Sequence, residues 1–165
     1  MKLKIYLIIT LYIKYMDSLF RGCNKILSLP DLSKWNISNV IDISYLFSGC
    51  LSLKSLPDVS NWNTNKIENI EYLFAFCKSL LTIPDISKWY IKRVFSMHSI
   101  FFKCSSLSSL PDISNWNVSK IKTIKNLFYE CNSLLKLPNI GKWDIRKVKD
   151  MSYFHINFLS LSLFV

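Results

Sequence analysis

The chain has 165 residues, of which 50% are hydrophobic, 15% aromatic and 19% charged, and its net charge is +10. This apolar composition excludes intrinsic disorder, which requires few apolar residues and a high charge fraction. The longest apolar run, residues 5–13, is well short of the roughly 20 residues of a transmembrane helix, so the sequence predicts no membrane span.

Residues 1–23 resemble a weakened copy of the repeats that follow. The segment opens with two lysines and an apolar run, as a signal peptide does, but no small-residue cleavage site follows. From Ile13 to Cys23 it keeps the apolar spacing of the later units. We therefore predict that 1–23 is a degraded or partial N-terminal repeat.

Residues 24–158 consist of five units of 27 residues. Every Pro, Trp and Cys of the chain belongs to one of three columns that advance by 27 without an insertion, beginning at Pro30, Trp35 and Cys23. A unit this short cannot bury its own apolar face, so neighbouring units must stack, and the period falls in the roughly 20–29 residues of leucine-rich repeats. The sequence predicts an α/β leucine-rich-repeat solenoid of five full units with partial units at its ends.

The first half of each unit is predicted to hold a short parallel strand. Its apolar residues step by three, as in Leu53, Leu56, Val59 and Trp62, which fits neither the period of a strand nor that of a helix. Because proline donates no N–H, a column of prolines is excluded from the middle of a parallel ladder. We therefore expect the strand just before proline, around 53–56, and a bend at Pro-Asp.

The second half of each unit is predicted to be a short amphipathic helix. Its apolar residues recur with helical spacing; in the first unit they are Val40, Ile43, Leu46, Phe47 and Cys50. Ser38, Asn65 and Ser119 precede this stripe, where their side chains suit N-caps. One strand and one helix per unit predict an arc of parallel strands.

The repeat weakens at the C-terminus. His155 and Phe158 stand where the other units have Phe and Cys, and 159–165 is predicted to be a truncated C-terminal strand. Neither end has the polar cap that a solenoid requires. We expect a piece of a longer array, whose uncapped ends favour self-association.

The consensus CxxLxxLPDISxWNxSNVxxMxxLFxxC resembles the leucine-rich repeats of BspA-like surface proteins of bacteria and microbial eukaryotes. The resemblance covers residues 13–158. It implies a leucine-rich-repeat fold, a location at the cell surface or outside the cell, and a binding or adhesion role without catalytic activity.

Two columns carry residue types that bind metals in other proteins. Each Cys ends a predicted helix, and stacked helices lie roughly 8–10 Å apart, so we expect buried, reduced thiols rather than disulfides or a tetrahedral site. The Asp column continues as Asn139 in the last unit, which keeps turn hydrogen bonding and loses the charge. We therefore predict turn chemistry and neither metal nor cofactor.

Aromatic and catalytic residue types also have simple structural interpretations. The Trp column would suit stacking on bases or sugars, but it continues the apolar series of Leu and Val and is predicted to lie in the core. The two histidines, His98 and His155, stand alone, with His98 in a column predicted to be solvated. The sequence therefore predicts no catalytic residues and no enzyme.

The net charge of +10 suits a polyanion, but the lysines are spread over several columns. One local cluster comprises Arg146, Lys147 and Lys149. A drifting AT-rich gene would produce the same charge without a partner, so both interpretations stay open.

The sequence favours a non-catalytic protein-interaction or adhesion module that binds a protein partner through exposed strand-side residues. The candidate binding residues are Lys54, Ser55, Thr82, Ser108, Ser109 and Lys136. Two alternatives stay open: a basic polyanion or nucleic-acid binder, and a truncated product without independent function.

Overall fold

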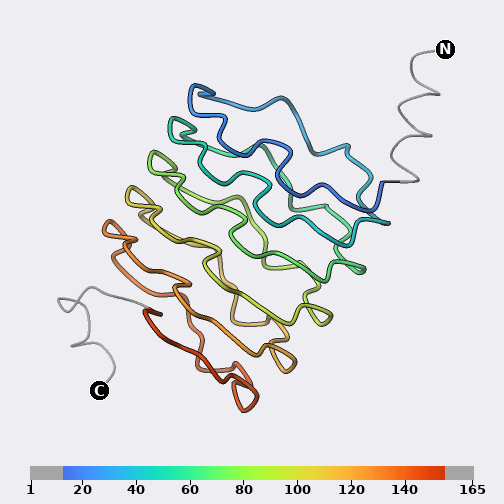
Figure 1. Ribbon diagram of the computed structural model, residues 1–165, viewed down its shortest axis with the longest axis vertical. Helices are drawn as coiled ribbons and strands as arrows, with labels where there is room; N and C mark the ends of the chain where they lie inside the picture. Colours follow the sequence, from blue (N-terminus) through green and yellow to red (C-terminus); the bar gives the residue numbers. More distant parts are fainter. Residues whose placement is uncertain (1–12, 155–165) are drawn as a thin grey trace.

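The computed structural model describes residues 13–154, so the predictions for 1–12, His155, Phe158 and the strand 159–165 lie outside it. The described chain winds into stacked coils of 27 residues (Figure 1). A partial coil, 13–23, is followed by coils 24–50, 51–77, 78–104 and 105–131 and by residues 132–154. The prediction of a repeat solenoid is confirmed.

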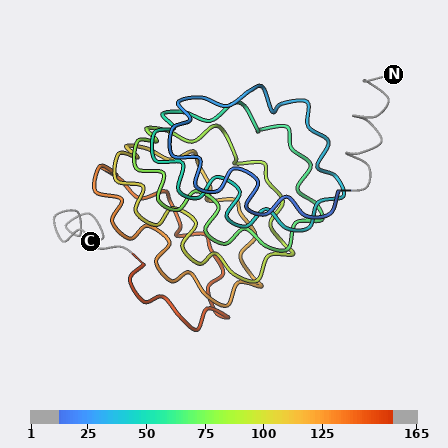
Figure 2. The same ribbon diagram turned by 45° about the horizontal axis from the view of Figure 1, so that its top comes forward.

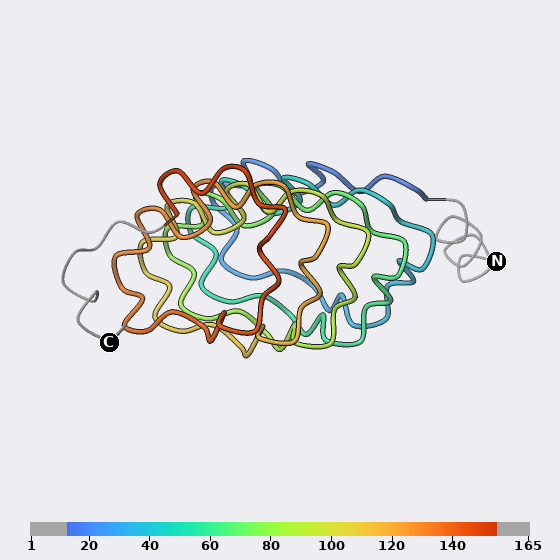
Figure 3. The ribbon, with the colours of Figure 1, turned by 90° about the horizontal axis from the view of Figure 1, so that it is seen from below.

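Each coil is flattened, so its two halves form two layers with the core between them (Figures 2 and 3). Tight loops of successive coils stack along both edges of the molecule (Figure 1). The core is built from equivalent residues of every coil, among them Val59, Ile70 and Phe74, which are almost wholly buried. Trp62 is also buried as predicted, whereas Leu56 only packs partly buried against the core.

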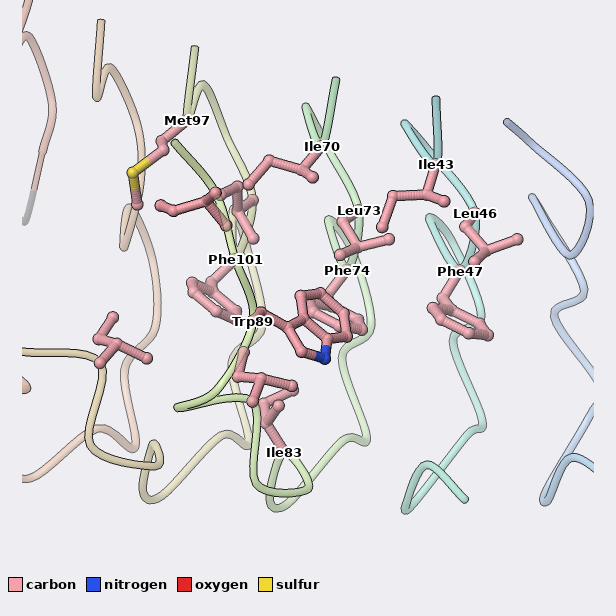
Figure 4. Close-up of a cluster of buried hydrophobic side chains, with 14 of the residues drawn as sticks. Ile43, Leu46, Phe47, Ile70, Leu73, Phe74, Ile83, Trp89, Met97 and Phe101 are labelled. Carbon is pink, nitrogen blue, oxygen red and sulfur yellow. The ribbon is translucent and has the colours of Figure 1, made fainter. Parts of the chain in front are cut away.

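A stack of phenylalanine rings runs through the core and sets the spacing of the coils. The members are Phe20, Phe47, Phe74, Phe101 and Phe128. Neighbouring ring centroids lie 5.6–5.7 Å apart, and the ring planes differ by at most 12°. Figure 4 shows three of these rings at the same level in successive coils. Since the rings are nearly parallel, one coil follows another every 5–6 Å.

The predicted helix is wrong: residues 13–154 contain no α-helix, and the second half of each coil is a series of tight turns. Backbone N–H groups there donate alternately to a carbonyl of their own coil and to a carbonyl of the next coil. The N–H of Leu46 donates to Ile43 in its own coil (3.3 Å), whereas that of Phe47 donates to Leu73 in the next coil (3.0 Å). An α-helix with side chains is about 10 Å across, so it does not fit into coils that repeat every 5–6 Å.

Two columns of residues with positive φ produce this alternation. In coil 24–50 they are Tyr45, with φ of 56°, and Gly49, with φ of 75°. The equivalent residues are Ser18, Tyr72, Ser99, Asn126 and Tyr153, and Gly22, Phe76, Lys103 and Glu130. A left-handed residue every fourth position interrupts a right-handed helix. Since only two of these residues are glycine, composition did not indicate the turns.

The predicted N-caps consequently have another role. The backbone N–H groups of Ser38, Asn65 and Ser119 donate to the side-chain oxygens of the Asn two residues earlier, at 3.1–3.2 Å. These bonds close Asx turns at the edge of the solenoid rather than beginning a helix.

The predicted strand is likewise replaced, by isolated parallel bridges of one residue pair each. Before proline, parallel pairing is confined to the single bridge between Thr82 and Ser109. Further single bridges lie in the half that was predicted to be helical: Tyr15–Asp42, Asp42–Asn69, Ser96–Thr123 and Thr123–Asp150. No strand longer than one bridge occurs in residues 13–154, although N–H groups beside the bridges, such as those of Ile41 and Leu81, also donate to the preceding coil.

Four of the five residues in each of the Cys and Trp columns lie in the core as predicted, and each of these also donates a hydrogen bond to an earlier coil. Cys23 and Trp35, in the first units, are half-buried. The thiol of Cys104 donates to the carbonyl of Phe74 (3.0 Å), and the indole N–H of Trp89 donates to the carbonyl of Val59 (3.1 Å). Cys50, Cys77 and Cys131, and Trp62, Trp116 and Trp143, repeat these bonds. All five thiols are free.

Candidate functional site

The Asp column forms Asx turns, as predicted. The side-chain oxygen of Asp85 accepts the backbone N–H of Ser87 at 2.9 Å, and hydrogen bonds from this serine hold the pKa of the carboxyl below its ordinary value. Asp31, Asp58, Asp112 and Asn139 make the same bond. No group of three or more His, Cys, Asp or Glu side chains in residues 13–154 is arranged to hold a metal ion.

The lone His98 is half-buried rather than solvated. Its ring lies 2.6 Å from the hydroxyl of Tyr72 and 3.1 Å from the carbonyl of Lys125. These contacts tie together three successive coils, and the hydroxyl of Ser99 lies 3.5 Å from Nδ1 of the same ring.

The predicted binding residues are all exposed and lie in two neighbouring columns. Lys54 and Ser108 belong to one column; Ser55, Thr82, Ser109 and Lys136 belong to the other. Backbone bonds run along the first column: the N–H of Leu81 donates to Lys54 (3.1 Å), and that of Ser108 donates to Leu81 (3.0 Å). The residues therefore form one continuous surface, with Lys54 and Ser55 two coils away from Ser108 and Ser109.

This series of backbone bonds ends at Ser108, and a groove opens there. The next coil instead bonds through the N–H of Ser133 to the carbonyl of Ser105, at 3.2 Å. The groove has a volume of about 330 Å³ and lies between segments 108–112 and 135–139. Three of the predicted residues, Ser108, Ser109 and Lys136, line it.

Sequence reasoning missed the apolar part of the groove. Leu135, whose side chain is 82% exposed, lines it together with Leu110, Leu137 and the two prolines Pro111 and Pro138. The column of Leu135 contains Leu27, Lys54, Leu81 and Ser108. Lys and Ser in one column with Leu indicate an exposed position, and this signal was present in the sequence.

The groove combines polar groups with apolar walls. It brings together one ammonium group, two hydroxyls, the carboxylate of Asp112 and the amide of Asn139. That carboxylate is held by its own Asx turn with Ser114. Such a surface can accommodate an apolar side chain and hydrogen-bond to the groups around it.

No helix long and apolar enough to cross a membrane is found in residues 13–154.

The chain belongs to the family DUF285, which is described as a Mycoplasma protein of unknown function and which matches residues 5–83 and 53–160. No curated protein matches the chain.

Two solved structures, both titled leucine-rich repeat proteins, are similar to it. The protein TpLRR of T. pallidum has 19% identity and a TM-score of 0.42, over 77% of this chain and 63% of that one. A protein of Bacteroides ovatus has 21% identity and a TM-score of 0.39, over 82% of this chain and 38% of that one. The chain thus spans less than two thirds of the length of either.

Proposed function

We propose that the protein is a non-catalytic interaction module of leucine-rich-repeat type, which binds a protein partner through the groove between 108–112 and 135–139. The observation that carries this proposal is Leu135, an apolar side chain 82% exposed beside hydroxyl and ammonium groups. Exposed apolar side chains rimmed by polar residues are typical of protein-binding surfaces.

The partner that fits is an extended peptide segment with an apolar side chain. The groove receives that side chain between Leu135 and Leu110, while Ser109 and Lys136 are placed for its backbone carbonyls. The resemblance of the repeat to those of BspA-like proteins supports an adhesion role at the cell surface as part of the same proposal.

A peptide library displayed on phage tests this function. We expect panning on the purified chain to enrich peptides with a common apolar position, and a synthetic copy to bind in calorimetry. Leu135→Asp should abolish this binding. Leu27→Asp is the matched control, because Leu27 occupies the same column and is 64% exposed, but lies far from the groove.

Failure to enrich any peptide, or equal binding by the Leu135→Asp and Leu27→Asp variants, would contradict the proposal. The tryptophan fluorescence of both variants checks that the fold is retained, since Trp62, Trp89 and Trp116 lie in the core.

A further inference from the structure

A second surface lies on the other half of the coils, where four successive turns carry cations at their tips. Each turn is closed by a backbone bond, such as that from the N–H of Val94 to the carbonyl of Ile91 (2.9 Å) and that from Ile121 to Val118 (2.9 Å). The lysines and arginines at the centres of these turns, and those two positions beyond the centres, make up what we term the basic stripe. Its members are Lys66, Lys92, Arg93, Lys120, Lys122, Arg146, Lys147 and Lys149, all of them exposed.

The basic stripe holds much of the positive charge of the molecule. It contains eight of the 21 Lys and Arg residues. Two carboxylates contact it: Glu68, 3.9 Å from Arg93, and Asp144, 2.7 Å from Arg146. The cluster Arg146, Lys147 and Lys149 recognised in the sequence is one end of this stripe, so the cations are not scattered. Cations from several columns lie together at one edge of the solenoid, and this clustering is not apparent when each column is counted by itself.

A neighbouring column of turns at the same edge, four or five residues earlier in each coil, provides an internal comparison. Its turns carry Lys34, Lys88 and Lys142, which alternate with Asn61 and Asn115. These lysines lie beside the Asp column, and Lys34, Lys88 and Lys142 help to lower the pKa of Asp31, Asp85 and Asp112, respectively, after the dominant hydrogen bonds from serine. Cations of these neighbouring turns therefore occur only in every second coil, whereas the basic stripe has at least one cation in each of four successive coils.

The cations of the stripe lie on successive, hydrogen-bonded coils. The N–H of Lys149 donates to the carbonyl of Lys122, and the N–H of Lys122 donates to that of Phe95, each at 2.8 Å. The ammonium of Lys66 reaches the side-chain oxygen of Asn39 in the preceding coil, at 2.6 Å, so adjacent turn tips are within contact distance. Successive coils are about 5.7 Å apart at the Phe47 and Phe74 rings, so the backbone positions that carry these cations are closer than the Debye length of about 8 Å and their like charges repel each other. A linear polyanion laid along the stripe would relieve that repulsion.

Exposed aromatic rings lie within the same surface. The ring of Phe95 is 47% exposed, and the ammonium groups of Lys120 and Lys122 both lie 5.8 Å from its centroid. Tyr90, at the start of the same bend, is also exposed. Cations that follow a backbone, together with aromatic rings on which bases stack, are typical of surfaces that bind single-stranded nucleic acid. Residues 13–154 offer no helix to enter the major groove of a duplex.

We propose that the basic stripe binds single-stranded nucleic acid without sequence preference, with its cations on the phosphates and with Phe95 stacking on a base. This surface is separate from the groove at 108–112 and 135–139, and the proposal does not depend on the function assigned to that groove.

The test measures binding of a fluorescent 20-nucleotide oligo-dT to the full chain by anisotropy, between 50 and 300 mM salt. The stripe variant carries Lys66→Gln, Lys120→Gln and Lys147→Gln. The matched control carries Lys34→Gln, Lys88→Gln and Lys142→Gln, which removes the same charge from the neighbouring column of turns. If all three stripe lysines contact phosphates, the slope of log affinity against log salt should fall by about 2, which corresponds to roughly 100-fold at 0.1 M salt. The control should change affinity less than about threefold.

The variant Phe95→Ala distinguishes binding of a nucleic acid from binding of other polyanions. It should weaken oligo-dT binding at least about fivefold, the lower end of the effect of one stacked base, and leave heparin binding unchanged. Equal losses in the stripe variant and its control, or no measurable binding of oligo-dT at 50 mM salt, would overturn the proposal. Stronger binding of heparin than of oligo-dT, insensitive to Phe95→Ala, would assign the stripe to a sulfated glycan instead. Leu135→Asp, which tests the groove, should leave oligo-dT binding intact.

Discussion

The phenylalanine stack offers the most direct test of how the coils are held together. Phe74 is wholly buried and lies parallel to Phe47 and Phe101, with 5.7 Å between ring centroids in both pairs. Phe74→Leu keeps an apolar side chain in the core and removes both ring contacts. Each stacked pair contributes about 0.5–1.5 kcal/mol beyond its buried area, so the free energy of unfolding should fall by about 1–3 kcal/mol.

Urea unfolding followed by tryptophan fluorescence measures this loss. With an m-value of about 2 kcal/mol/M, the midpoint should fall by roughly 0.5–1.5 M. The same substitution at the exposed ring, Phe95→Leu, is the control and should change stability by less than about 0.5 kcal/mol. A loss at Phe74 no larger than that at Phe95 would refute the reasoning.

Double-mutant cycles identify the stacking itself. Phe74→Leu and Phe101→Leu remove one ring pair in common, so together they should cost about 0.5–1.5 kcal/mol less than the sum of the single losses. Phe47→Leu and Phe101→Leu share no pair, because Phe74 lies between them, and should be additive. Additivity in both cycles would show that the rings contribute only buried area.

Two further predictions concern the thiol column and the left-handed turns. Burial raises the pKa of the Cys104 thiol well above its ordinary value of 9.0. Above pH 9 this thiol therefore ionises in the unfolded chain and stays protonated in the folded chain. Stability should fall there by up to about 1.4 kcal/mol per pH unit for this thiol, and urea titrations between pH 8 and 10.5 should show a shallower fall for Cys104→Ala. Gly49→Ala should cost about 1–2 kcal/mol in the same assay, since φ is 75°, a conformation that residues with a Cβ rarely adopt. The control Gly141→Ala, where no positive φ applies, should be nearly neutral; equal effects would contradict the assignment of strain.

The sequence by itself determined the repeat, the length of each unit, and which of the repeated columns face the core and which face the solvent. A gapless period of 27 requires every coil to superpose on the next, so the same residue type recurs at the same depth. That is why Trp62, Cys77 and Phe74 could be assigned to the core, and Asp85 to a turn, before any coordinates were known. The exposure of Lys54 and Ser108 followed from the same reasoning, since a column that accepts Lys and Ser as well as Leu faces outward.

Only the tertiary structure decided the local conformation and the two surfaces. The apolar spacing from Ile43 to Cys50 suits a helix as well as it suits the observed turns, because both place every third or fourth side chain on one face. The choice was made by the coil spacing of 5–6 Å, which leaves no room for helices and lets alternate N–H groups bond to the next coil. The groove at Leu135 and the basic stripe depend in turn on which columns meet at an edge and where the backbone bonds between coils stop. Both surfaces depend on contacts between residues 27 or more positions apart. A periodic sequence pattern predicts that such residues stack, but it does not predict how the chain turns between them.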